Sequence, residues 1–388
     1  MLLSHFTPSS AQKVLEADSV HVYLLTCSPH QQVYSLYGHT ALRIEDRQRG
    51  TDWAVNYGVF DFRKSFFVLR FVFGLTDYEI GIYPFSVFIQ EYVRCGSGVV
   101  QQELNLTPEE KLRVLAAIDE NYRPENRVYR YNYFHDNCTS RAMDIVTENI
   151  DGRVVYNDMV DDGMTFRKLI HQMNGDHPWA RLGNDLLLGM GADRQLDQRE
   201  KHFLPHMMQE AADSAVIIAS DNSRRPLVKA SSQVLRVGTQ VVEEEFPLTP
   251  VQCAVLLLFV SCTVTFVEWR RKRYLWVWDA VQLTLAGVCG IILTAMIFSQ
   301  HPTVSVNAQL LLFNPLPLLF GVQAIRRCRR GQMHWLWMVE MLLACLLFVC
   351  FSFGIQWIDM SVRIVALSLL VRYCANVQRC HPMVHKIS

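Results

Sequence analysis

Long apolar runs distinguish the last third of the chain from the rest. After residue 246, runs of about 17 to 24 residues with few charges alternate with short polar or basic segments. A helix needs about 20 apolar residues to cross the hydrocarbon of a bilayer, so these runs are typical of membrane spans. We expect five spans, at 251–267, 275–298, 308–325, 335–355 and 360–377. A buried helical bundle of a soluble protein fits less well, because only short connections separate the runs.

The basic residues beside these runs predict how the spans are oriented. Arginine-rich clusters follow the first span and the third, and basic residues follow the fifth, whereas the connections 300–307 and 356–361 contain no Lys or Arg. Basic loops remain in the cytoplasm, so the C-terminus should lie there and the residues before 247 outside. We therefore expect a remnant of a signal peptide in 1–11, an exported domain in 12–246 and a transmembrane domain in 247–388.

Shorter patterns before residue 247 predict a mixed α+β domain. Runs of β-branched and aromatic residues between turn residues indicate strands, and apolar residues spaced by three and four indicate helices. Thr107, Pro108 and Glu110 form a capping box that fixes the start of one helix. We expect strands at 20–26, 40–44, 53–57 and 99–106, helices at 85–93, 107–121, 139–149, 164–173, 181–190 and 203–215, and a loop at 220–232.

The charge is distributed unevenly between the two parts. After residue 246 there are twelve Lys and Arg against four Asp and Glu, a charge of +8, and because the whole chain has a net charge of zero, the first part carries −8. An acidic exported part excludes a nucleic-acid binder built on a broad positive face. Of the eleven cysteines, only Cys27, Cys95 and Cys138 precede residue 247, so at least one of these three has no disulfide partner within the exported part.

Cys138 is the strongest candidate for a chemical role. It stands at the start of an expected helix, directly after Asp136 and Asn137, two residue types that cap helices. The N–H groups and the dipole at a helix N-terminus stabilise a thiolate. His39, which follows a glycine at the start of an expected strand, is the best candidate for its base. We find no metal-binding spacing, no phosphate-binding glycine loop and no serine nucleophile elbow.

These residues carry a resemblance to a known family. His39 to Arg43 (His-Thr-Ala-Leu-Arg), followed about a hundred residues later by 136–141 (Asp-Asn-Cys-Thr-Ser-Arg), resembles the exported domain of the Bacteroidota-type lipoprotein N-acyltransferase family, Lnb. Further similar segments are 25–29, 56–62, 124–127, 301–302 and 313–316. The order of histidine before cysteine also resembles the permuted papain-like enzymes, which form acyl-thioesters with lipids.

The resemblance implies a fold, a reaction and a set of site residues. The fold would be a permuted papain-like α+β domain followed by an all-α membrane domain of about five helices. The reaction would move an acyl chain from a membrane phospholipid, through a thioester on Cys138, to the N-terminal amine of a diacylated lipoprotein. Asn56 or Tyr57 would orient His39, and we choose Asn56. The expected substrate-binding residues are Tyr37, Arg43, Tyr57, Asn137, Arg141, His301, Asn307 and Asn314.

The same resemblance implies the surroundings of the reaction. The protein would sit in a bacterial inner membrane, with its N-terminal domain in the periplasm and its C-terminus in the cytoplasm. Its partners would be the bilayer, the phospholipid and the lipoprotein, without a cofactor, a metal or a nucleic acid. Two alternatives stay open from the sequence: a membrane-tethered cysteine hydrolase that cuts peptidoglycan peptides or lipids, and a transporter or sensor with an exported ligand-binding domain. A transporter should depend on the intramembrane acids, whereas either enzyme should depend on Cys138.

Overall fold

The structure, a computed structural model, describes residues 17–30, 35–60, 66, 70, 73–157, 163–239 and 246–380. The expected signal-peptide remnant, 1–11, lies outside these residues. The chain forms two compact units. The first combines Met1–Met173 with Gln195–Glu244, and the second combines Asn174–Arg194 with Glu245–Ser388. The segment Asn174–Arg194, which precedes the expected membrane domain in the sequence, thus packs with the C-terminal helices.

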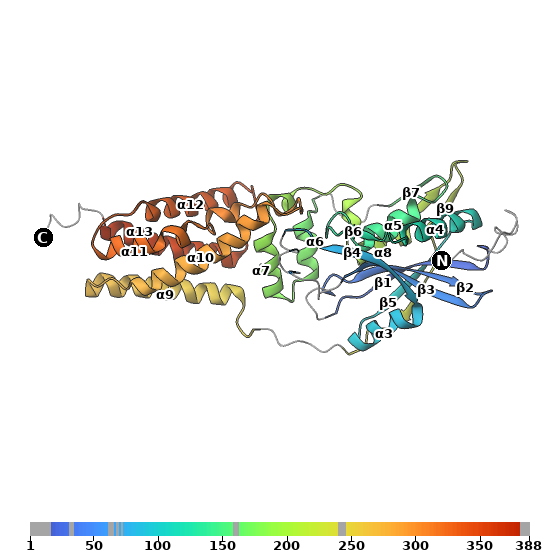
Figure 1. Cartoon of the computed structure of the whole chain (residues 1–388), viewed down its shortest axis with the longest axis horizontal. Helices are drawn as coiled ribbons and strands as arrows, with labels where there is room; N and C mark the ends of the chain where they lie inside the picture. The colour runs from blue at the N-terminus through green and yellow to red at the C-terminus, as the bar shows by residue number, and fades with distance from the viewer. Residues whose placement is uncertain are drawn as a thin grey trace. The chain divides into compact units, whose positions relative to one another are not determined.

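A seven-stranded antiparallel sheet organises the first unit (Figure 1). Its strand order is β10-β5-β1-β2-β3-β4-β6, so β1, β2 and β3 lie next to one another at its centre. The strands are β1 (Val20–Cys27), β2 (His39–Asp46), β3 (Thr51–Val59), β4 (Asp77–Pro84), β5 (Val99–Leu104), β6 (Val128–Arg130) and β10 (Val228–Leu235). A smaller sheet contains β7 (Arg153–Val155), β8 (Val216–Ile218) and β9 (Arg224–Pro226).

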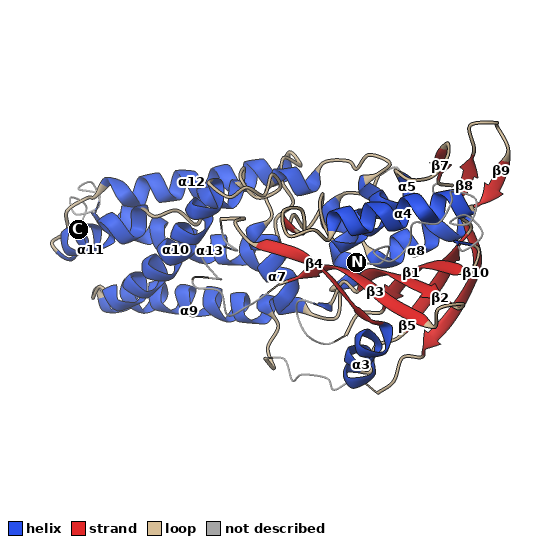
Figure 2. Cartoon of the chain, turned by 45° about the vertical axis from the view of Figure 1, so that its right-hand side comes forward, coloured by secondary structure: helices blue, strands red, loops and turns tan. Residues whose placement is uncertain are grey.

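Helices cover both faces of the large sheet, because alternate residues of its central strands are apolar on both sides. Leu24, Leu42 and Val55 belong to a core shared with helices on one face, and Leu25 and Ala54 belong to a second core on the other face. Figure 2 shows α3 on one side of the sheet and α4, α5 and α8 on the other. The helices are α3 (Phe85–Cys95), α4 (Pro108–Asn121), α5 (Cys138–Thr147), α6 (Phe166–Met173) and α8 (Pro205–Ser214).

The expected elements of this unit are present, with one correction. Thr107 caps α4, and the full capping box with Glu110 is formed. The segment 220–232, expected to be a loop, contains β9 and most of β10 instead. The side chains of β10 are almost all exposed, so no burial pattern marks it in the sequence. Backbone pairing with β5 makes it a strand.

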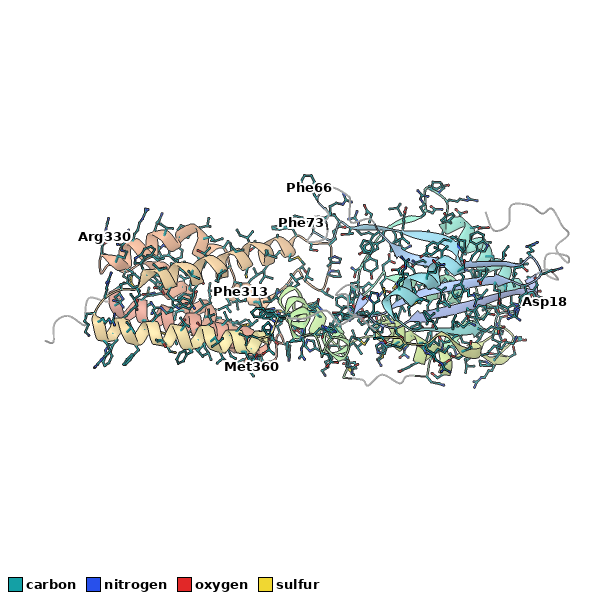
Figure 3. The ribbon with its side chains drawn as sticks, turned by 90° about the horizontal axis from the view of Figure 1, so that it is seen from below. Asp18, Phe66, Phe73, Phe313, Arg330 and Met360 are labelled. Atoms are coloured by element: carbon teal, nitrogen blue, oxygen red, sulfur yellow. The ribbon has the colours of Figure 1, made fainter. Side chains whose placement is uncertain are left out.

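Among the described residues of the second unit, five helices are long and apolar enough to cross a membrane, as expected. They run over Pro250–Arg271, Trp276–Ile297, Ala308–Arg329, Trp335–Ser352 and Met360–Cys380. The third is broken, as its prolines predict: a short 3₁₀ turn, η4 (Ala308–Leu311), precedes α11 (Leu316–Arg329). Phe313, labelled in Figure 3, is buried beside this break. The other spans are α9 (Pro250–Arg271), α10 (Trp276–Ile297), α12 (Trp335–Ser352) and α13 (Met360–Cys380).

Helix α7 (Pro178–Leu187) and the turn η2 (Met190–Asp193) belong to this second unit. The N–H of Gly189 donates to the carbonyl of Thr303, and the N–H of Met190 donates to that of Val306, both at 2.8 Å. A side chain at Gly189 would collide with the carbonyl of Val306. The connection 300–307 between the second and third spans is therefore held by backbone contacts to residues that precede all five spans.

A buried ion network joins three of the spans. Arg372 of α13 donates to Glu268 of α9 and to Asp279 of α10, over 2.7 to 3.2 Å, and all three side chains are 1% exposed. Charged groups this deep are stable only when they are paired and hydrogen-bonded. The network accounts for Asp279 and Arg372, two of the charges that interrupt the expected spans.

Candidate active site

Cys138 is the first residue of α5, and Asn137 is its N-cap. The side-chain oxygen of Asn137 accepts hydrogen bonds from the N–H groups of Thr139 and Ser140, at 2.8 and 2.9 Å. Its side-chain nitrogen donates to the carbonyls of Tyr133 and Phe203. Of the two capping candidates in the sequence, Asn137 therefore takes this role. Cys138 is 8% exposed.

His39 is the first residue of β2 and lies opposite Cys27 of β1. Strand alternation places His39 on the same side as Ala41, which belongs to the core under α3. The His39 ring also interacts with Cys138 on α5 through a hydrogen bond. A second hydrogen bond joins β2 to α5 at the next residue of each element, between the hydroxyls of Thr40 and Thr139, which are 2.9 Å apart.

Asn56 of β3 completes a Cys–His–Asn arrangement. Its side-chain oxygen is 2.6 Å from Nε2 of His39. This leaves Nδ1 of His39 as the ring nitrogen for the thiol. Asn56 is itself held by Tyr83 of β4, whose hydroxyl accepts a hydrogen bond from Nδ2 of Asn56 at 2.6 Å. Three neighbouring strands thus fix the orientation of one imidazole ring.

The local electrostatics favour a thiolate and an imidazolium. Burial raises the pKa of Cys138, but His39, the Thr40 backbone N–H and the Thr139 hydroxyl together lower it below its ordinary value. Burial lowers the pKa of His39, but Cys138 and Asn56 raise it above its ordinary value. Opposite charges in contact favour each other's charged form. An activated nucleophile beside its base is the arrangement that covalent catalysis requires.

The other two cysteines before residue 247 lack this environment. Cys27 is buried, and burial raises its pKa far above the ordinary value, which keeps it a thiol. Its partner is the hydroxyl of Tyr92. Cys95 lies at the end of α3 and is partly exposed, and both are free cysteines. Cys138 is thus the one of the three with a histidine partner among the described residues.

Of the expected substrate-binding residues, Asn137 and Arg141 adjoin Cys138 at the start of α5, whereas Tyr37 and Arg43 lie on other segments. Tyr37 packs edge-on against Tyr133, with ring centroids 5.3 Å apart. Arg141, one turn after Cys138, forms a two-pronged ion pair with Asp136 at 2.5 and 2.7 Å. Arg43 lies four residues beyond His39 on β2 and is ion-paired with Asp52 at 2.8 Å.

Tyr57 and the three residues expected in the membrane domain have separate surroundings. Tyr57 is buried, and its hydroxyl has no partner among the described residues. Asn307 donates to the carbonyl of Leu186 and accepts from Gln309 and Gln356. Asn314 donates to Glu340 at 3.1 Å and accepts a hydrogen bond from the N–H of Leu316, the first residue of α11. His301 lies in the connection before η4, and burial lowers its pKa, which favours the neutral ring.

Several residues at the site have no signal that a single sequence reveals. Thr40, Thr139 and Tyr83 act through contacts between elements, so only the strand register brings them to His39 and Cys138. Gly58 has a φ of +96°, a conformation that favours glycine. A Cβ there would lie 3.9 Å from both Cβ of Cys138 and Cε1 of His39. Among the described residues, no group of three or more His, Cys, Asp or Glu could hold a metal ion.

The fold and the spans together define a multi-pass membrane protein that carries a mixed α/β domain ahead of five apolar helices. Family comparison makes this specific. The Lnb N-terminal periplasmic domain matches residues 7–172, and the Lnb transmembrane domain matches residues 242–381. The chain belongs to the Lnb family, a family of lipoprotein-processing membrane proteins, and its N-terminal domain is periplasmic. No curated protein and no solved structure matches the chain.

Proposed function

We propose that the protein is a lipoprotein N-acyltransferase that uses Cys138 as its nucleophile. The observation that carries the proposal is the hydrogen-bonded arrangement of Cys138, His39 and Asn56, in which the pKa of the thiol is lowered and that of the imidazole is raised. Both substrates of such a reaction are lipids, which accounts for five spans attached to the domain that carries the thiol. The site would face the outer surface of a bacterial inner membrane, with the C-terminus in the cytoplasm.

The first half of the reaction forms a thioester. The Cys138 thiolate attacks the carbonyl carbon of a phospholipid ester, and the carbonyl electron pair moves to the oxygen. When that pair returns, the carbon–oxygen bond to the glycerol breaks. The His39 imidazolium donates its proton to the departing alkoxide, which leaves as a lysophospholipid. Asn56 keeps the ring directed at the sulfur throughout.

The second half forms an amide. The neutral N-terminal amine of a diacylated lipoprotein attacks the thioester carbon, and His39 accepts a proton from the nitrogen. Collapse of the intermediate breaks the carbon–sulfur bond and regenerates the thiolate and imidazolium. An ester is exchanged for a thioester and then for an amide, a more stable bond, so the sequence of steps needs no external energy source and no cofactor.

The proposal is tested by mass spectrometry of the intact purified protein after incubation with a phospholipid of defined acyl chains. We expect a mass increase of one acyl chain on Cys138, lost on adding a diacylated lipopeptide with a free amine. Cys138→Ala should form no adduct and lower transfer by more than about 10³-fold, since the residue is the nucleophile. Cys27→Ala and Cys95→Ala are the controls and should keep both activities.

Three results would contradict the proposal. Transfer by Cys138→Ala at the wild-type rate would exclude Cys138 as the nucleophile. An adduct that water releases while the lipopeptide amine stays unmodified would instead indicate a cysteine hydrolase. Loss of activity in Cys27→Ala or Cys95→Ala, with normal folding, would indicate a different nucleophile.

A further inference from the structure

Three tyrosines form a cluster on the α5 side of β4 and β6. Tyr78 and Tyr129 are paired across these strands, so their side chains leave the sheet on the same face. Tyr131 lies two residues after Tyr129 and stacks on Tyr78 with ring centroids 4.1 Å apart. Tyr129 lies 6.5 Å from each of the other two rings. We call Tyr78, Tyr129 and Tyr131 the tyrosine cluster.

The tyrosine cluster and Cys138 belong to the same hydrophobic core. A Cβ on Gly58 would be 3.9 Å from Cβ of Cys138 and equally far from Cδ1 of Tyr78. For all three hydroxyls, Cys138 is the charged group with the largest influence, and together with burial it raises their pKa values. All three hydroxyls therefore stay protonated at neutral pH, as hydrogen-bond donors must.

Tyr129 differs from the other two in how its hydroxyl is placed. Its side chain is 7% exposed, and its hydroxyl is buried without a hydrogen-bond partner among the described residues. Leaving such a group unpaired destabilises the folded protein, so native proteins seldom do so without a reason. The guanidinium of Arg141 lies 3.6 Å over the Tyr129 ring. Asp136 in turn fixes Arg141, so the ring is held in place.

A second donor beside the sulfur is also open. The N–H groups of Thr139 and Ser140 donate to the Asn137 side chain, and the N–H of Asn137 donates to the hydroxyl of Ser140. Within the described part of the chain, the N–H of Cys138 has no acceptor. Asn137 thus accepts hydrogen bonds from the N–H groups of the two residues after Cys138, and the N–H of Cys138 itself stays available to a substrate.

We propose that the hydroxyl of Tyr129 and the backbone N–H of Cys138 form the oxyanion hole of this site. This inference rests on the proposed function and adds a catalytic residue to it. When the thiolate attacks an ester carbonyl, the carbonyl oxygen gains the electron pair and a negative charge, and two preorganised donors stabilise it until the pair returns. The nearby Arg141 cation strengthens the hydroxyl as a donor. The acceptor for both donors is this negatively charged oxygen, which exists only during the reaction.

The test compares acylation with alkylation of Cys138 in full-length protein. A nitrophenyl ester of a short fatty acid acylates the thiol through an oxyanion, whereas iodoacetamide alkylates it by direct displacement without one. In Tyr129→Phe, we expect acylation by the ester and by phospholipid to slow by about 10²–10³-fold, the usual loss for one oxyanion donor. Alkylation should keep its wild-type rate and pH dependence. The unfolding temperature should be unchanged or higher, because an unpaired buried hydroxyl has been removed.

Matched variants separate Tyr129 from its neighbours. Tyr133→Phe removes another buried, unpartnered hydroxyl close by, and should acylate like the wild type. Three outcomes overturn the inference. Tyr129→Phe could acylate within about threefold of the wild-type rate, or its alkylation rate could fall as much as its acylation rate. The loss of acylation could also appear in Tyr78→Phe or Tyr131→Phe instead of Tyr129→Phe. If the wild type reacts with the nitrophenyl ester but not with phospholipid, the proposed function fails while the oxyanion hole is still tested. If it reacts with neither, both fail.

Discussion

Replacing Asn56 with Ala tests how His39 is held. Asn56 binds Nε2 of His39 at 2.6 Å, and no other partner of that nitrogen is present among the described residues. In the active state the imidazole is charged, and a hydrogen bond to a charged group contributes about 1.5–3 kcal/mol. Each 1.36 kcal/mol corresponds to a factor of ten in rate. We therefore expect thioester formation in Asn56→Ala to slow by roughly 10- to 150-fold.

Asn56→Ala should also shift the pH dependence of thioester formation in a defined direction. The reactive pair, a thiolate and an imidazolium, exists above the pKa of Cys138, which is lowered, and below the pKa of His39, which is raised. The hydrogen bond that Asn56 accepts from Nε2 of His39 is one cause of the higher His39 pKa. Without it, the His39 pKa falls, and the weaker cation beside the sulfur lets the Cys138 pKa rise. Both limbs of the pH profile should therefore move toward each other.

The assay is adduct formation on Cys138 from phospholipid, measured by intact mass between about pH 5 and 10. Gln102→Ala is the control, because Gln102 is a buried amide of β5 that donates to Asp213 and Gln209 away from the site. Gln102→Ala should lower thermal stability and leave both limbs of the pH profile where they are in the wild type. A profile for Asn56→Ala that superimposes on the wild type, or that widens, would refute the role of Asn56 as the residue that orients His39.

Three further predictions concern topology, the membrane network and the connection 300–307. A membrane-impermeant maleimide applied to whole spheroplasts should label a cysteine at Ser231, which is exposed on β10, but not one at Ser388; the reverse pattern would refute the orientation. Arg372→Met should destabilise the detergent-solubilised protein by about 3–5 kcal/mol in thermal or denaturant unfolding, because it leaves Glu268 and Asp279 buried and unpaired; an unchanged midpoint would contradict this. His301→Ala and Asn314→Ala should slow turnover at limiting phospholipid or lipopeptide, and full activity in both would leave the membrane domain as an anchor.

Local patterns predict those elements whose cause is local. The capping box at Thr107 and the helix start after Asn137 depend on residues within one turn, and the structure has both. The long apolar runs predict the spans for the same reason, since length and composition alone decide whether a helix can cross a bilayer. Strand β10 could not be predicted in this way, because pairing with β5, more than a hundred residues earlier, determines it.

The candidate site follows the same division. Cys138 and His39 can be chosen from their immediate neighbours in the sequence, and the family resemblance adds Asn56. Tyr83 and Tyr129 cannot be chosen, because the register between β3, β4 and β6 decides which of many aromatic residues reach the site. Tyr129 also lies in a run that alternates aromatic and polar residues, and this pattern predicts a strand equally well without any chemistry.

Burial of Cys138 has two opposite effects on the proposed reaction: it protects the thioester from water, and it disfavours the thiolate. A thioester can be released by water as well as by an amine, so transfer requires a site from which water is largely excluded. The sulfur lies in such a site, beside the tyrosine cluster. The same burial disfavours the thiolate, and this is the largest single influence on the pKa of Cys138. Hydrogen bonds from His39, Thr40 and Thr139 offset that influence. A buried nucleophile therefore requires hydrogen-bond donors. Here β2 and α5 provide them at the point where the two elements meet.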